Sequence, residues 1–306
     1  MSTLRNDAEV DSEGESREGS LHPGNNLNDL TGKEWIKATK SWLVCDSPRY
    51  HQNRDTELHP ARYPEELVAD FVRFFTKREG WVLDPFCGSG ATLVSALEQG
   101  RNGIGLDVNR HYVELTRDRL AEMAQDSETR ADVIHADARR VAEAETWESA
   151  DALSRGGDGL PRFDFIMTSP PYWDMLRKSR GGVESKHRER AKQGLATDYG
   201  GREGDLGTVE DYDEFIEALG LVFDGCARLL LPLKYMVVVV QNVRVPEGHV
   251  RPLAWDLARR ISDTLSFQGE RIWCQDSKRL GIWGYPTTFV PNYHHHYCLI
   301  FRREED

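Results

Sequence analysis

The sequence has no hydrophobic run long enough to cross a bilayer, and it has few cysteines. Its longest apolar run, around Tyr235 to Val240, is much shorter than the roughly 20 residues that a membrane-spanning helix needs. The five cysteines are an odd number, and no pair of them has the spacing of metal ligands. No secretory signal is recognisable at the acidic start. We therefore expect a reduced, cytoplasmic protein with no membrane contact and no metal site.

The sequence also has fewer positively charged residues than acidic ones. The 306 residues hold 39 Lys and Arg against 51 Asp and Glu, which gives a net charge of −12. Nucleic-acid enzymes are often basic, but binding depends on where the positive residues cluster and not on their total. Part of the acidity lies at the very start of the chain, which has almost no large apolar residues. We expect residues 1–30 to form a disordered acidic tail and residues 31–306 to form one domain.

From Gly80 onward, short apolar segments alternate with helical patterns. Helices are predicted at residues 90–99, 109–120, 212–230 and 252–265. Strands are predicted at residues 81–84, 103–107, 132–135, 163–168, 235–240, 271–274 and 296–301. Strands that alternate with helices form a largely parallel sheet covered on both faces. The last two strands have no helix between them, which indicates an antiparallel edge.

The sharpest local pattern is VLDPFCGSGAT at residues 82–92. A buried strand ends in Asp84, passes through a turn with Gly88 and Gly90, and opens a helix. Glycine lets the backbone approach a ligand closely at the carboxyl edge of such a sheet. The spacing is neither the dinucleotide fingerprint nor a P-loop, since no Lys-Ser/Thr follows. The alternative is a tight strand-to-helix turn without a ligand.

Two further strands end in acidic residues, Asp107 and Asp137. Asp107 follows the glycine turn by about twenty residues, where a carboxylate can accept both hydroxyls of a ribose. Together with Asp84, these acids would form a rim that suits a ribose, an adenine amino group and an ammonium, and that suits a pyrophosphate poorly. Alternatively, Asp107 is a helix cap and Asp137 a turn residue.

The fourth strand ends in TSPPYW at residues 168–173. Two prolines fix the backbone there, so that the Ser169 hydroxyl and the Pro170 carbonyl are candidate acceptors. Tyr172 offers a flat ring on which a base can stack. Acceptors that hold both hydrogens of an exocyclic amine favour a more tetrahedral nitrogen, whose lone pair can attack the methyl group of a sulfonium. The alternative is a rigid turn.

In combination, these segments resemble the amino-methylating DNA methyltransferases, the cytosine-N4 and adenine-N6 enzymes. DPFCGSG at residues 84–90 resembles their cofactor motif. SPPY at 169–172 resembles their catalytic motif in the serine form, which in the family is associated mainly with cytosine-N4 products. HPARYPEEL at 59–67 resembles the segment that closes over the methionine part of the cofactor. The resemblance spans roughly residues 35–303. It departs from the commonest pattern in its motif order, with the cofactor motif first, and in Ala91, where Thr is frequent.

The resemblance implies a class I S-adenosylmethionine-dependent methyltransferase fold, which is an α/β, Rossmann-like, seven-stranded sheet with helices on both faces, preceded by a helical lid segment. It implies S-adenosylmethionine as the cofactor and double-stranded DNA with a flipped base as the substrate. It assigns catalysis to Ser169, Pro170, Pro171 and Tyr172. It assigns cofactor binding to Pro60, Asp84, Pro85, Phe86, Cys87, Gly88, Gly90, Asp107 and Asp137.

The expected function is methyl transfer to cytosine N4 in DNA, within restriction-modification or phage defence, with restriction or defence-system proteins as candidate partners. Adenine N6 is the first alternative target. An RNA amino methyltransferase is the second, although such enzymes usually carry an acid before the prolines and an added RNA-binding domain. The third alternative is an inactive DNA-binding relative.

Two segments are candidates for DNA recognition, at residues 173–207 and 276–292. The first is long for a loop in a compact domain and follows the catalytic motif directly, which favours phosphate contact over a merely solvated loop. The second mixes positive charge, glycines and aromatic residues between the last two strands. The basic candidates are Arg177, Lys178, Arg180, Lys186, Arg188, Arg190, Lys278 and Arg279.

The run His294-His295-His296 does not predict a metal site. Adjacent residues on a strand point to opposite faces, and no partner cysteine or acid has ligand spacing.

Overall fold

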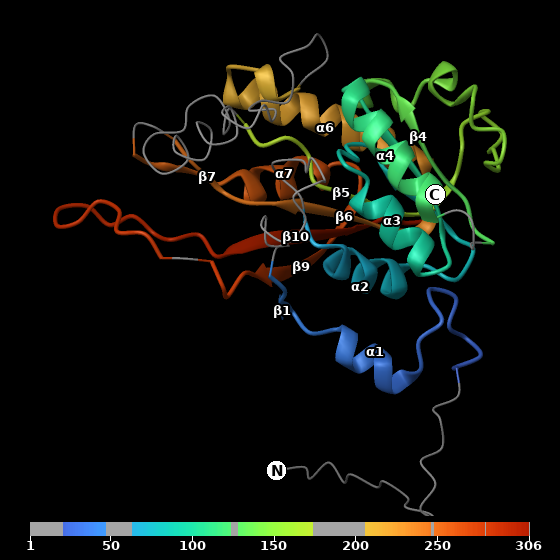
Figure 1. Cartoon of the computed structure of the whole chain (residues 1–306), viewed down its shortest axis with the longest axis horizontal. Coiled ribbons are helices and arrows are strands. Elements are labelled where there is room, and N and C mark those ends of the chain that lie inside the picture. The colour runs from blue at the N-terminus through green and yellow to red at the C-terminus, as the bar shows by residue number, and fades with distance from the viewer. Residues whose placement is uncertain are drawn as a thin grey trace, which may run out of the picture.

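The structure is a computed structural model that describes residues 21–46, 63–123, 128–173, 206–245, 248–278 and 280–305. Figure 1 shows one twisted sheet with helices packed against both of its faces. Of the expected acidic tail, residues 1–30, the first twenty lie outside the described residues. Among the helices that the structure describes, none combines the length and the apolar composition needed to cross a bilayer.

The described residues form an eight-stranded sheet in the order β1-β9-β10-β6-β5-β2-β3-β4. Neighbouring strands from β6 to β4 are parallel, and β10 is antiparallel to both β6 and β9. Without β1, this is the expected seven-stranded methyltransferase sheet. The strands are β1 (Trp42–Val44), β2 (Trp81–Asp84), β3 (Asn102–Asp107), β4 (Ala131–His135), β5 (Phe163–Thr168), β6 (Leu230–Val240), β9 (Ser266–Cys274) and β10 (His295–Arg302).

The eighth strand corrects one detail of the expected sheet. β1 pairs in parallel with β9 and forms the edge, so the antiparallel pair β9–β10 lies one strand in from the rim. A strand of only three residues is too short to show a period-2 pattern, which is why the sequence does not reveal it. A separate hairpin pairs β7 (Val243–Arg244) with β8 (Val250–Arg251).

Alternating side chains of the sheet pack against helices on opposite faces. Within β6, Val237 packs with residues of α2 (Glu65–Phe75), and the next residue, Val238, packs with α6 (Tyr212–Leu229) and α7 (Leu253–Ile261). In Figure 1, α6 lies above the sheet and α2 lies below it. The α2 face also carries α3 (Ala91–Glu98) and α4 (Arg110–Met123), and short 3-10 turns occur at Ala138–Arg140, Ala144–Trp147 and Leu206–Thr208.

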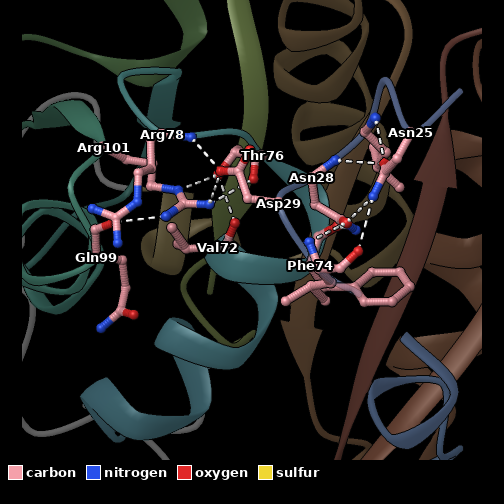
Figure 2. Close-up of polar contacts among 11 residues, drawn as sticks. Asn25, Asn28, Asp29, Val72, Phe74, Thr76, Arg78, Gln99 and Arg101 are labelled. Carbon is pink, nitrogen blue, oxygen red and sulfur yellow. Dashed lines mark hydrogen bonds and ion pairs between the residues drawn. The ribbon is translucent and has the colours of Figure 1, made fainter. Parts of the chain in front are cut away.

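The N-terminal described segment is bonded to the domain before residue 31, where the sequence places the domain boundary (Figure 2). Asn28 Nδ2 donates to the carbonyl of Phe74 in α2 at 2.6 Å. Asp29 lies 3.4 Å from the buried guanidinium of Arg101, which also donates to the hydroxyl of Thr76 at 3.0 Å and to its carbonyl at 2.8 Å. The packed domain therefore begins earlier than expected, ahead of the helix α1 (Gly32–Ala38).

Candidate active site

The glycine turn between β2 and α3 is packed tightly against its neighbours. Gly88 and Gly90 have φ of 51° and 79°, which favours glycine at both positions. A Cβ on Gly105 of β3 would lie 2.7 Å from the Cβ of Cys87, so only glycine lets this strand pass so close to the turn. The Gly88 carbonyl accepts a hydrogen bond from Thr116 of α4 at 2.9 Å. The turn is therefore held from two sides in one conformation.

Asp84 is buried and is bonded from several directions. Its Oδ1 accepts from the Thr168 hydroxyl at 2.6 Å and from the Phe86 amide at 3.1 Å. Its Oδ2 accepts from the Thr92 hydroxyl at 2.5 Å and from the Tyr63 hydroxyl at 2.9 Å. Burial raises the pKa of Asp84, and the hydrogen bonds from Thr168 and Thr92 oppose that rise. The carboxylate is 1 % exposed, which corrects the expectation that it belongs to an open acidic rim.

The bond between Asp84 and Thr168 joins the two motifs that the sequence singles out. Asp84 ends β2 directly before the glycine turn, and Thr168 ends β5 directly before Ser169. Because β2 and β5 are adjacent parallel strands, both motifs leave the sheet at the same edge. The structure thus brings the expected cofactor segment and the expected catalytic segment together.

Asp107 ends the neighbouring strand β3 and is partly exposed. One carboxylate oxygen accepts from the Gly88 amide at 2.9 Å and the other from the Asn109 amide at 2.8 Å. Asn109 caps α4, since its Oδ1 accepts from the His111 amide at 3.1 Å. Asp107 thereby links the glycine turn to the start of α4 at the carboxyl edge of the sheet.

Asp137 differs from Asp107 because it already has a strong partner. Its carboxylate forms an ion pair with the Arg139 guanidinium at 2.5 Å and also accepts from the Arg139 amide at 2.9 Å. This favours the alternative in which Asp137 is a turn residue. A ligand amino group would have to share the carboxylate with Arg139.

The other expected cofactor residues lie in the turn itself. Phe86 is partly exposed, whereas the side chains or Cα atoms of Pro85, Cys87, Gly88 and Gly90 are buried. Burial raises the pKa of the Cys87 thiol. The side chains open to a ligand around the turn are therefore those of Phe86 and Asp107. Pro60 lies outside the described residues.

The structure describes the whole of the expected catalytic segment, through Trp173. Ser169 and Pro171 are partly buried, and Pro170 is buried. Tyr172 is only 5 % exposed, and its hydroxyl lies 3.3 Å from Nδ1 of His296. Burial raises the pKa of Tyr172 to about 12, and a hydrogen bond with Ser169 opposes that rise. A base could stack on this ring only after neighbouring groups move.

The structure adds residues to the site that sequence reasoning missed. Tyr63, Thr92 and Thr168 supply hydroxyls to Asp84, and His296 contacts Tyr172. Thr168 could have been suspected, because a hydroxyl in an otherwise apolar buried strand needs a partner. His296 could not, since only the register of β10 brings it beside a residue 124 positions earlier in the chain.

The two expected DNA-recognition segments are described to different extents. Residues 174–205, with the basic candidates from Arg177 to Arg190, and Arg279 lie outside the described residues. Lys278 donates to the Tyr293 carbonyl at 2.7 Å, at the root of the segment 276–292, which we call the arm. In Figure 1 the arm extends away from the sheet as a long red loop between β9 and β10. Four apolar side chains of the arm are each at least 80 % exposed, namely Leu280, Ile282, Tyr285 and Phe289.

The three consecutive histidines serve three different contacts. His294 bonds to the carbonyls of Asn292 and Lys278, which closes the root of the arm. His295 Nε2 lies 3.2 Å from the Tyr297 hydroxyl, and His296 contacts Tyr172. Within the described residues no group of His, Cys, Asp and Glu could hold a metal ion.

Comparison with known proteins places the glycine turn within a family match. The sequence model of a family described as DNA methylase matches residues 8–118. The type II methyltransferase M.ScaI of Streptomyces caespitosus is 34 % identical over 67 residues, which are 22 % of either chain. M.MthZI of Methanothermobacter thermautotrophicus is 37 % identical over 89 residues, covering 29 % of this chain and 25 % of the relative. This chain thus spans about a quarter of the length of the curated relatives it matches.

Two solved structures to which the chain is similar are TrmN and a SAM-dependent methyltransferase. TrmN from Thermus thermophilus is 12 % identical with a TM-score of 0.45, covering 78 % of this chain and 48 % of TrmN. A SAM-dependent methyltransferase from Methanosarcina mazei is 14 % identical with a TM-score of 0.43, covering 82 % of this chain and all of that one. Over part of its length the chain is similar to DNA methylases, and its described residues have the fold of S-adenosylmethionine-dependent methyltransferases.

Proposed function

We propose that this chain transfers a methyl group from S-adenosylmethionine to the exocyclic N4 amino group of cytosine in DNA. The observation that carries the proposal is the hydrogen bond of 2.6 Å between Asp84 and Thr168, which holds the glycine turn beside the Ser-Pro-Pro-Tyr segment. Transfer between a bound donor and a bound acceptor requires the two sites to be adjacent. The family match covers the glycine turn but ends before Ser169, so the catalytic role of that segment rests on its position.

The residues around the glycine turn fit S-adenosylmethionine. Asp107 follows the glycine turn at the sheet edge, where a carboxylate can accept ribose hydroxyls, and the partly exposed Phe86 offers an apolar ring in the turn itself. The missing Cβ atoms of Gly90 and Gly105 leave the turn compact, with no side chain of its own to fill the sheet edge. When bound, the cofactor supplies an electrophilic methyl group on a sulfonium.

The catalytic segment would hold the target amine. The Ser169 hydroxyl and the Pro170 carbonyl are acceptors for the two amine hydrogens, which favours a tetrahedral nitrogen with an available lone pair. The two prolines keep these acceptors in place without a change of backbone conformation at the moment of reaction. No covalent bond between enzyme and base is needed.

The substrate side of the proposal rests on the arm, which joins the sheet beside the catalytic segment. The arm begins after Cys274, which ends β9, and returns to His295, one residue before the partner of Tyr172. Phosphate contact by the basic residues between Arg177 and Arg190 stays a prediction. Restriction or defence proteins as partners also stay a prediction.

Transfer of labelled methyl groups to purified nucleic acids tests the proposal. Wild-type protein should label double-stranded DNA, and Ser169→Ala should bind S-adenosylmethionine with nearly unchanged affinity but label DNA more slowly, because the lost acceptor matters most in the transition state. Label in RNA of matched sequence, and none in DNA, would contradict the proposal and favour the RNA alternative. No binding of S-adenosylmethionine would favour an inactive relative.

A further inference from the structure

Arg119 of α4 bridges the glycine turn and the start of α2. Its Nη1 donates to the carbonyl of Ser89 in the turn. Its Nη2 donates at 2.5 Å to Oε1 of Glu65, the first residue of α2. The two side chains are 17 % and 29 % exposed, so the ion pair is partly shielded from solvent. A guanidinium is a rigid fork of N–H donors, and here two of its nitrogens bind two different elements.

Helix α4 holds the turn at two consecutive carbonyls. The Thr116 hydroxyl donates to the Gly88 carbonyl at 2.9 Å, and Arg119 donates to the carbonyl of the next residue, Ser89. Residues three apart lie on the same face of a helix, so Thr116 and Arg119 approach the turn from the same side. Arg119 extends this contact to α2.

The start of α2 is in turn linked to both ends of the glycine segment. The Tyr63 hydroxyl donates to Asp84, which directly precedes the turn, at 2.9 Å. Glu65 reaches Ser89, near the end of the turn, through the guanidinium of Arg119. The conformation of the turn is therefore coupled to the position of α2, and Arg119 supplies one of the two links.

We propose that Arg119 is a positioning residue for S-adenosylmethionine, which keeps the glycine turn in the conformation that receives the cofactor. Gly88 and Gly90 both have positive φ, and glycine permits many other backbone conformations. Contacts from outside the turn therefore have to select one of them. A site that is already in its bound conformation binds more tightly, because less freedom is lost on binding. This inference rests on the proposed function, which places the cofactor at this turn.

The first test does not depend on activity. Arg119→Met keeps an unbranched side chain but removes both donors. Arg117→Met is the matched control, because Arg117 also lies on α4 and donates to a backbone carbonyl at 2.9 Å, but that carbonyl belongs to Val133 of β4. Mass spectrometry of amide hydrogen exchange should show faster exchange over residues 85–90 in Arg119→Met and no change there in Arg117→Met. Equal exchange in Arg119→Met and the wild type would overturn the inference.

The second test separates positioning from a general loss of stability. Arg119→Met should raise the dissociation constant of S-adenosylmethionine by about tenfold, the lower end of what a hydrogen bond from a charged group contributes. The KM for the cofactor should rise in parallel, while kcat at saturating cofactor and the KM for DNA stay near the wild-type values. A variant that is merely less stable has fewer folded molecules, but these keep the wild-type KM. Reduced thermal stability with unchanged cofactor affinity would therefore overturn the inference.

Glu65→Gln tests the contact with α2. It should weaken cofactor binding less than Arg119→Met does, since Arg119 keeps its bond to Ser89. The double variant should bind the cofactor no more weakly than Arg119→Met, because Glu65 acts on the turn through Arg119. Additive losses from the two changes would overturn this link.

The same double variant decides against a purely electrostatic explanation. Burial and the charge of Glu65 raise the pKa of Glu98 in α3, and the charge of Arg119 lowers it. Arg119→Met therefore leaves two acids facing each other, and their repulsion is relieved in the double variant. Recovery of cofactor affinity there would assign the loss to repulsion and overturn the inference. A wild-type protein that binds no S-adenosylmethionine would instead contradict the proposed function, and the exchange rates would still decide whether Arg119 holds the turn.

Discussion

At the scale of single residues, the carboxylates of Asp84 and Asp107, which the sequence predicts in one acidic rim, have different contacts in the fold. Asp84 is enclosed by hydroxyl and amide donors from β5, α3 and the segment before α2, whereas Asp107 holds the glycine turn and is partly exposed. The sequence predicts where both acids lie. It does not predict that Asp84 is buried and Asp107 partly exposed. The burial of Asp84 depends on Tyr63, Thr92 and Thr168, which converge only in the folded chain.

Replacing Asp84 by asparagine is expected to destabilise the fold. The amide can accept with one oxygen only, so two of the four donors lose their acceptor, at a cost of about 1–3 kcal/mol in the free energy of unfolding. Denaturant unfolding measures this cost. Asp164→Asn is the matched control, because Asp164 also accepts from a backbone amide, that of Trp81, but is more exposed, so it should cost less. Equal stability of Asp84→Asn and the wild type would contradict this account.

The pH dependence of stability is a second test of the buried Asp84 carboxyl group. Because burial raises the pKa of Asp84 above its ordinary 3.8, the folded protein holds this proton more tightly than the unfolded chain. The contribution of Asp84 to stability is therefore largest in acid and falls as pH rises from 3.8 through the raised value. Asp84→Asn should remove this part of the slope, as unfolding curves at several pH values would reveal. An unchanged slope would assign the pH dependence to other groups.

Asp107 and Asp137 are expected to respond differently to substitution. Asp107→Ala should weaken S-adenosylmethionine binding by about 1–3 kcal/mol, since the ribose hydroxyls lose their acceptor. Asp137→Ala should weaken it less, because Arg139 already occupies that carboxylate. Titration calorimetry measures both. A larger loss with Asp137→Ala would reinstate Asp137 as a direct cofactor ligand.

At the scale of elements, the glycine turn and β3 depend on one close approach. Gly105→Ala would place a Cβ 2.7 Å from the Cβ of Cys87, and overpacking of this kind costs about 1–3 kcal/mol of stability. The turn should shift, so cofactor affinity should fall as well. Gly157→Ala is the control, because a Cβ there meets nothing within 4 Å, and it should change stability by less than about 0.5 kcal/mol. If Gly105→Ala binds the cofactor normally, the close approach is not needed for the site.

The arm between β9 and β10 is expected to contribute to DNA binding through apolar contacts. Ile282→Ser combined with Phe289→Ser should weaken DNA binding by at least about 1 kcal/mol while leaving thermal stability unchanged, since both side chains are exposed. Fluorescence anisotropy with labelled duplex measures the affinity. Ile36→Ser on α1 removes an exposed apolar side chain elsewhere and should have no effect. Equal DNA affinity of the arm variant and the wild type would exclude the arm from the interface.

The sequence predicts the longer strands well. It does not reveal a very short strand or the contacts that depend on the register between paired strands. The strands ending at Asp84, Asp107 and Thr168 agree with the structure, because each is a buried apolar run next to glycine or proline. β1 is too short to carry a pattern. The contact of His296 with Tyr172 arises from strand pairing between distant segments, so periodicity along the chain holds no trace of it.

At the scale of the whole molecule, the strand order and the Asp84–Thr168 bond support a methyltransferase whose donor and acceptor sites share one sheet edge. The excess of acidic residues counts mildly against nucleic-acid binding. It describes the whole chain, however, and not the charge at this edge of the sheet. What separates the possible products is therefore the chemistry at Ser169, which on the proposed mechanism would hold an amine through neutral acceptors.

Nucleoside mass spectrometry of DNA from an expressing strain that lacks other methylases tests this central claim most directly. We predict N4-methylcytosine that disappears when the strain expresses Ser169→Ala instead of the wild type. N6-methyladenine in its place would keep the fold, the cofactor and the mechanism but contradict the assignment of the base. Unmodified DNA together with methylated RNA would contradict the assignment of the substrate itself.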